Sequence, residues 1–407
     1  MSVPGTRLCV LLLAGGARWE AEVLAALGQA GVVVVKRCVD VPDLMASAVS
    51  SGAGVAVVEG TLPHLDAEAV MHLLRYDVRV LGIGDPALAE RLGRLGVVET
   101  TEPVPSQVVA AVRRVAARDV LPDPELVTPG EDDDAPVDRG RIVAVWGPTG
   151  APGRTTVAVG LAAELARTRP AVLVDADPYG GTVAQALGVL DEASGLLAAA
   201  RMANVGTLDA AGFARSCRRV GDRLEVLTGL PRADRRVEVR PGVLGGVLAV
   251  AAGSGAVVVD CGFCVEDADS VRDRMTIDAL GAADEVVVVG SAEPSGLARL
   301  ARGLVEVQDV VAAIPVRVVV NRMRPTLGWR EKDIVAMIEG YVRPAGVHFL
   351  SEDRPAMDRS TVAGRSLTEL GDSPLRAAMA EVVSAIWPTG ATERARGGRR
   401  RRLDGVR

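Results

Sequence analysis

The chain has 407 residues and a formal net charge of −6; 49% of the residues are hydrophobic, but only 2% are aromatic. This length is sufficient for two ordinary domains, and the apolar content excludes an extended disordered protein. So few aromatic rings argue against a platform that stacks the bases of single-stranded nucleic acid. The five cysteines are too sparse in a chain of this length for a disulfide scaffold.

Residues 1–118 alternate short apolar runs with amphipathic stretches such as 19–29 and 107–117. The runs at strand length are 8–13, 32–36, 55–58, 78–83 and 97–99. This alternation predicts a small, doubly wound α/β domain of the flavodoxin-like or receiver-like type.

Glu59 follows the third of these runs, at the position where response regulators carry a phosphorylated aspartate. The acidic pair expected after the first strand is missing, because residues 12–16 contain no carboxylate, and no lysine occurs near 97–101. The domain therefore resembles a pseudo-receiver that is not phosphorylated and serves as an interaction surface. A structural α/β lobe without a regulatory role is the alternative.

Residues 119–140 combine prolines with eight acidic side chains and a single arginine, Arg139. Like-charge repulsion and the lack of apolar clusters predict an extended linker between two domains.

Residues 141–388 resume the strand and helix alternation with longer apolar runs. The expected strands are 142–146, 171–175, 224–227, 256–260, 285–290 and 316–321. Continuous Val, Leu and Ile without polar alternation indicates strands buried on both faces, hence a mostly parallel sheet. The longest uncharged run, 242–259, contains five glycines and divides into a helix, a turn and a strand, so we expect no transmembrane segment and a cytoplasmic protein.

A glycine-rich turn, residues 147–156, links the first of these strands to a helix. Such a turn directs backbone N–H groups inward, and the helix N-terminus adds the positive end of its dipole, which is how phosphate groups are bound. Compared with the P-loop pattern, Pro148 stands at the first glycine and Arg154 at the lysine, while Thr155 stands at the magnesium-binding hydroxyl. A plain strand–turn–helix connection is an equally good interpretation of this segment alone.

Carboxylates at the ends of two later strands favour the phosphate loop. Asp175 and Asp177 end one strand, and Asp260 ends another. Because the carboxyl ends of parallel strands face the ligand crevice, these groups and the loop are predicted to meet at one edge of the sheet.

This arrangement resembles the MinD/ParA family of P-loop ATPases, and more narrowly the CpaE/TadZ and actinobacterial septum-site (Ssd) proteins, which place a degenerate receiver-like domain before a MinD-like domain. The resemblance rests on the segments 147–156, 172–181, 257–260, 318–322 and 347–375.

The resemblance implies a site for ATP and Mg²⁺. Arg154 would contact phosphates, Asn321 would bind the adenine edge, and Asp177 would position or activate the attacking water. Thr155, Asp175 and Asp260 would hold the metal. The expected nucleotide-binding residues are Gly150, Ala151, Pro152, Gly153, Arg154, Thr155, Thr156 and Asn321.

One departure from the family bears on turnover. The family's signature lysine, which reaches the partner's phosphates across an ATP-sandwiched dimer, falls on Thr149. Because phosphoryl transfer depends on positive charge, we expect weak or absent ATP hydrolysis, and a homodimer would form through another surface or without ATP control.

These features leave three hypotheses open. The first is an ATP-binding spatial regulator that positions a septum or a pilus or secretion machine through protein partners, with recruitment to membrane or pole. The second is a ParA-like partition ATPase that binds DNA nonspecifically, and the third is a nucleotide-free scaffold with a vestigial loop. The tail 389–407, rich in glycine and arginine, is predicted to be disordered and would bind DNA or anionic lipid weakly, or remain solvated.

Cys261 and Cys264 have dithiol spacing but directly follow Asp260. Packing beside the nucleotide is the favoured interpretation, and a redox switch is the alternative. The histidines His64, His72 and His348 show no metal-ligand spacing.

Overall fold

The computed structural model describes residues 8–62, 65–117, 139–190, 193–267, 270–311 and 313–388. The predicted linker, apart from residues 139–140, lies outside these ranges, as do the predicted tail and His64. The chain divides into two compact units: the first holds the described residues up to 117 with 199–212 and 238–247, and the second holds the others.

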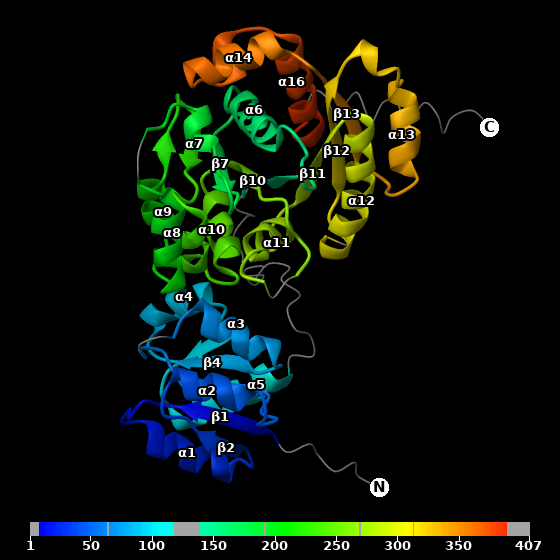
Figure 1. The fold of residues 1–407 in the computed structure, drawn as a ribbon. Helices are drawn as coiled ribbons and strands as arrows, with labels where there is room; N and C mark the ends of the chain where they lie inside the picture. Colours follow the sequence, from blue (N-terminus) through cyan, green and yellow to red (C-terminus); the bar gives the residue numbers. More distant parts are fainter. Residues whose placement is uncertain are drawn as a thin grey trace, which may run out of the picture. The chain divides into compact units, whose positions relative to one another are not determined.

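The N-terminal part is a regular β/α alternation (Figure 1). Its elements are β1 (Cys9–Leu13), α1 (Glu20–Gln29), β2 (Val33–Arg37), α2 (Val41–Ala48), β3 (Val55–Glu59), α3 (Ala67–Arg75), β4 (Arg79–Ile83), α4 (Pro86–Arg94), β5 (Glu99–Thr101) and α5 (Pro105–Ala117). All five strands are parallel, in the order β2-β1-β3-β4-β5. That order is the flavodoxin-like one, so the predicted topology is confirmed.

Residues 139–388 form a larger β/α array. Its elements up to the middle strand are β6 (Ile142–Trp146), α6 (Arg154–Ala166), β7 (Ala171–Ala176), α7 (Val183–Ala186), α8 (Gly195–Asn204), α9 (Ala210–Ser216), β8 (Arg218–Arg219), β9 (Leu224–Leu227), the 3₁₀ helix η1 (Ala233–Glu238), α10 (Val243–Ala252) and β10 (Ala256–Cys261). The remaining elements are α11 (Arg274–Gly281), β11 (Glu285–Ser291), α12 (Pro294–Val310), β12 (Val316–Met323), η2 (Pro325–Leu327), α13 (Glu331–Glu339), β13 (Gly346–Ser351), α14 (Arg354–Ala363), α15 (Leu367–Leu370) and α16 (Pro374–Ile386).

The second sheet has eight strands in the order β13-β12-β11-β6-β10-β7-β9-β8. Only the β8–β9 pair is antiparallel, which confirms the predicted, mostly parallel sheet. Every residue of β6, β10 and β11 is buried, as the uninterrupted apolar runs predict. The uncharged run 242–259 divides into α10, a turn and β10.

Helices α6 and α16 pack together over one face of this sheet (Figure 1). Val143, Val145 and Val258 contribute to the core beneath them. A Cβ on Gly160 of α6 would touch Met379 of α16, so this glycine allows the two helices to approach closely. The packing fixes the position of α6, whose N-terminus follows the glycine-rich turn.

Candidate functional site at the glycine-rich loop

The glycine-rich loop leaves the carboxyl end of β6 and enters α6 directly. Gly150 and Gly153 have positive φ angles of 71° and 92°, a conformation that residues with a Cβ rarely adopt. Gly153 is the N-cap of α6, and no side chain caps the helix there. The first N–H groups of α6 are therefore available to an anion, with the helix dipole in favour.

Pro148, which departs from the P-loop pattern, is accommodated by a glycine on a later helix. A Cβ on Gly303 of α12 would lie 2.9 Å from the Pro148 ring. The loop closes on itself through a hydrogen bond from Ala151 N to Pro148 O of 2.9 Å. The proline thus lies buried against α12 without opening the turn.

The Arg154 guanidinium is directed back along the loop. It donates to Gly147 O at 3.0 Å and lies 3.8 Å from an Asp177 carboxylate oxygen. It also lies 5.9 Å from the centre of the Phe263 ring. Its side chain is only 17% exposed. Arg154, the residue predicted to bind phosphate, therefore lies at the loop, but its guanidinium already contacts protein groups.

Thr155 and Asp260 come together as predicted. The Thr155 hydroxyl donates to Asp260 Oδ2 at 2.7 Å, while Asp260 Oδ1 is buried and has no hydrogen-bond partner among the described residues. Burial, together with the nearby charge of Asp175, raises the pKa of Asp260 well above its usual range. A buried carboxylate with one unsatisfied oxygen is costly unless a ligand completes its environment.

Asp175 lies beside Asp260 on the neighbouring strand but is already hydrogen-bonded. Asp260 and Asp175 are paired in the β10–β7 register. The Asp175 carboxylate accepts from Val183 N at 3.2 Å and from Asp177 N at 3.3 Å. Burial raises the pKa of Asp175 to about 7. Asp175 therefore organises the turn after β7, and Asp260 is the carboxylate with an oxygen that no described donor reaches.

Asp177 and Asn321 also contact the loop. Asp177 faces Arg154 and accepts from Tyr179 N at 2.9 Å. The Asn321 side chain, at the end region of β12, donates from Nδ2 to Pro152 O at 3.1 Å, and its Oδ1 accepts from Arg322 N at 2.8 Å. A Cβ on Gly153 would collide with this amide. Asn321 thus fixes the loop, and its adenine contact stays a prediction.

These residues fit Mg²⁺ bound mainly through water and phosphate. Among the described residues, no set of three or more histidine, cysteine, aspartate or glutamate side chains is arranged to hold a metal ion. Mg²⁺ commonly takes one or two protein oxygens and keeps several waters. The Thr155 hydroxyl fits as a direct ligand, and the unsatisfied Asp260 oxygen fits as the acceptor of a metal-bound water.

Sequence reasoning missed two residues at the loop, Arg299 and Gly303, and a third, Thr276, near Asp177. The Arg299 guanidinium lies against Gly150, and Gly303 faces Pro148 from the same helix. The Thr276 hydroxyl is buried without a partner among the described residues and faces Gly262, near Asp177. No motif marks these positions. Only the i, i+4 spacing of Arg299 and Gly303 on α12 could have suggested a shared face.

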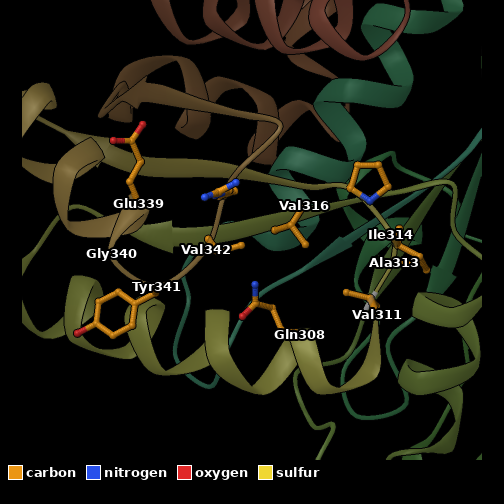
Figure 2. Close-up of a pocket in the computed structure, with 11 residues that line it drawn as sticks. Gln308, Val311, Ala313, Ile314, Val316, Glu339, Gly340, Tyr341 and Val342 are labelled. Carbon is orange, nitrogen blue, oxygen red and sulfur yellow. The ribbon is translucent and has the colours of Figure 1, made fainter.

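A pocket of about 490 Å³ lies away from the loop, between α12, β12 and the α13–β13 connection (Figure 2). Val316, the first residue of β12, lines it, so it lies at the amino end of the parallel strands. None of the predicted site residues lines it. Since the glycine-rich loop follows the carboxyl end of β6, this pocket is not part of the predicted nucleotide site.

The carboxyl edge of the N-terminal sheet is closed by protein contacts. Glu59 accepts from Trp19 Nε1 at 2.6 Å and from the Thr61 hydroxyl at 2.9 Å. Thr61 N adds a longer hydrogen bond of 3.3 Å. The carboxylate at the predicted pseudo-receiver position is thus held by three donors.

No helix within the described residues combines the length and apolarity that crossing a membrane requires.

No protein-family model matches the sequence, and no curated protein matches it either. Solved structures do match. The cell division ATPase MinD of Pyrococcus furiosus is 20% identical, covers 61% of this chain and 98% of its own, and gives a TM-score of 0.50. A ParA family ATPase from Chlorobium tepidum is 17% identical, covers 62% and 100%, and gives a TM-score of 0.51. The septum site-determining protein MinD of Pyrococcus horikoshii, solved with Mg-ADP, is 17% identical, covers 61% and 96%, and gives a TM-score of 0.49.

The first two matches show that the C-terminal, mostly parallel sheet has the fold of MinD/ParA ATPases, over about 60% of the chain.

Proposed function

We propose that the chain binds ATP with Mg²⁺ at the loop 147–156. The observation that carries the proposal is the Thr155–Asp260 pair, in which a buried carboxylate oxygen has no partner among the described residues and lies beside a helix N-terminus that no side chain caps. The MinD/ParA fold supports it, because the solved structures that share this fold are ATPases, and ligands of open α/β sheets bind at the carboxyl ends of the strands, where this loop lies. Within the site, the α6 N–H groups would bind phosphate oxygens, and Thr155 with Asp260 would hold the metal.

Bound Mg²⁺ would neutralise phosphate charge and orient the triphosphate. Thr155 would present a lone pair of its hydroxyl oxygen to the metal while its O–H still donates to Asp260. Asp177 would remain paired with Arg154, which limits its freedom to orient a water molecule. Thr149 is exposed and carries no charge. Weak or absent hydrolysis follows from these two features, because phosphoryl transfer needs positive charge that is free to meet the transferring group.

We further propose that the nucleotide state controls contacts with protein partners, as in a spatial regulator of a septum or of a pilus or secretion machine. The support is the combination of a MinD/ParA-like domain with an N-terminal flavodoxin-like domain whose acidic position, Glu59, is closed. A cytoplasmic location, with peripheral recruitment to membrane or pole, belongs to the same proposal. The CpaE-like assignment rests on the same domain order.

Titration of the full chain with a fluorescent ATP analogue, with Mg²⁺ or with EDTA, tests the binding proposal. Saturable binding that Mg²⁺ strengthens is expected, and Thr155→Ala removes the Mg²⁺ effect. Thr168→Ala is the matched control, since Thr168 lies beyond the other end of α6, where its hydroxyl donates to Leu165 O at 3.2 Å. Absence of binding in the wild type would favour the nucleotide-free scaffold.

Phosphate release by the wild type tests the second part of the proposal. Phosphate release by the wild type is expected to be no faster than the background release by the Asp177→Ala variant. Robust release that this variant abolishes would instead favour the ParA-like partition ATPase, as would a salt-dependent shift of nonspecific DNA.

A further inference from the structure

We propose that Arg299, on helix α12, is the phosphate-binding cation of this site and supplies from the same chain the positive charge that the loop lacks at Thr149. This inference rests on the proposed function, because it names the residue that would bind the terminal phosphates of the nucleotide.

The Arg299 side chain lies directly on the loop. A Cβ on Gly150 would collide with Arg299 Nη1 and would lie 3.3 Å from Arg299 Cζ. Gly150 is exposed and has a φ of 71°. The backbone turns there, and no side chain separates it from the Arg299 guanidinium. The guanidinium therefore covers the first half of the loop, next to Thr149.

Helix α12 is held in this place by a second contact one turn away. Gly303 packs against Pro148, and residues 299 and 303 lie on the same face of a helix because their spacing is i, i+4. Leu300 and Leu304 of α12 are buried, and α12 packs on β11, the strand next to β6. The position of Arg299 over the loop is thus set by packing on both sides of it.

The two arginines of the loop region differ in their availability. Arg154 donates to Gly147 O and faces Asp177 and Phe263, with little exposure. Arg299 is exposed and makes no hydrogen bond or ion pair with any described residue. A guanidinium has five N–H donors and binds phosphate oxygens in pairs without ever losing its charge. Arg299 is therefore the group that is free to take a phosphate.

An exposed arginine alone is commonly a solvated surface charge. Here a second feature of the same loop points to a ligand: Asp260, 1% exposed, holds Thr155 with one oxygen and leaves the other without a described partner. Arg299 at Gly150 and Asp260 at Thr155 thus mark the two ends of one loop. A metal-bound polyphosphate lying along the loop would meet the metal-binding end and the cationic end together.

Because α12 belongs to the same chain as the loop, the charge does not depend on a second copy. Nucleotide affinity is therefore expected to be independent of protein concentration.

The test measures the affinity of the full chain for fluorescent ATP, ADP and AMP analogues in the wild type, Arg299→Ala, Arg299→Lys and the control Arg302→Ala. Arg302 is also exposed on α12, and its Nε is 3.5 Å from Ala298 O on its own helix, so Arg302→Ala removes an equal charge. Arg299→Ala is expected to weaken ATP about 10- to 100-fold, with a smaller effect on AMP, as expected for lost charge-assisted hydrogen bonds. Arg299→Lys should be intermediate, and Arg302→Ala should match the wild type.

Wild-type binding with equal ATP affinity in Arg299→Ala would overturn this inference and leave the proposed function intact. Wild-type affinity that rises with protein concentration would overturn the same-chain origin of the charge. No nucleotide binding by the wild type would overturn the proposed function itself, and the inference with it. Because Arg299 is exposed, each variant is expected to unfold at the same temperature as the wild type. Equal unfolding temperatures would establish that a loss of affinity does not come from a loss of folding.

Discussion

Each of the two sheets carries an acidic side chain at the carboxyl end of an inner strand, Glu59 in β3 and Asp260 in β10, but the two carboxylates differ in how many hydrogen bonds they accept. Glu59 receives hydrogen bonds from Trp19 and Thr61. Asp260 receives one from Thr155, and its other oxygen is buried without a described partner. A carboxylate whose oxygens are filled by protein donors is part of the structure. One that is buried and left incomplete, beside open helix N–H groups, is poised for a ligand.

The largest expected effect comes from changing the incomplete carboxylate to an amide. Asp260→Asn is expected to weaken Mg²⁺-dependent ATP binding roughly 10- to 100-fold, as for other groups that hold a metal through water. Binding in EDTA should change little. Stability of the nucleotide-free protein should not fall, since burial disfavours the charged carboxylate that the amide replaces. Fluorescence titration and urea unfolding measure both. Unchanged Mg²⁺ dependence would remove the distinction between the two sheets.

The same chemical change in the other sheet is expected to act on stability alone. Glu59→Gln puts an NH₂ group where one of the two oxygens accepts from Trp19 or Thr61, so a hydrogen bond is lost and the free energy of unfolding of this unit should fall by about 1 kcal/mol. Trp19 is the one tryptophan in residues 1–118, and its fluorescence in urea reports this transition. Weaker ATP binding in Glu59→Gln would show that the two sheets are coupled.

A pH effect of similar or smaller size is expected at the far edge of the second sheet. Burial, with the charge of Arg317, lowers the pKa of His348 to about 4. As pH falls below about 6.5, the unfolded chain takes up this proton first, so the free energy of unfolding decreases down to about pH 4 and this contribution is constant below it. His348→Asn removes the contribution. The stability difference between wild type and variant should change by about 1 kcal/mol between pH 7 and pH 4, allowing for partial exposure of the ring. Parallel pH profiles would contradict the assigned shift.

The smallest effect is expected at the cysteine pair beside Asp260. Cys261 and Cys264 are buried, and burial raises the pKa of both thiols, so little reactive thiolate forms at neutral pH. Cys264→Ser should bind ATP with an affinity within about twofold of the wild type, before and after mild oxidant. A loss of wild-type affinity under oxidant that the variant escapes would support the redox-switch alternative.

Much of the fold could be predicted because its strands are locally unambiguous. The apolar runs that form β10 and β11 lack polar alternation, which only strands covered on both faces tolerate. β8, of two residues, carries no such pattern and was missed. β13, with a histidine and mostly half-buried residues, lies outside the predicted strands, although its segment is among those on which the family resemblance rests.

The candidate site divides in the same way. Gly150, Gly153, Thr155 and Asp260 stand in local patterns whose chemistry can be inferred from residue type and spacing, and the structure places them together. Arg299 and Gly303 come from a helix far downstream and carry no signal of their own, because ordinary helix surfaces contain the same residues.

The sequence by itself determined that one parallel and one mostly parallel sheet form and that a glycine-rich turn of the phosphate-loop pattern follows β6, since both follow from hydrophobic runs, glycines and strand-end carboxylates along the chain. Only the tertiary structure decided which carboxylate is complete and which cation is free. Trp19 reaches Glu59 from a distant loop, Arg154 turns to Gly147 and Asp177, and α12 lays Arg299 on Gly150. The physical reason is that saturation of a polar group depends on the donors and acceptors that neighbouring elements bring to it, and packing decides which elements become neighbours.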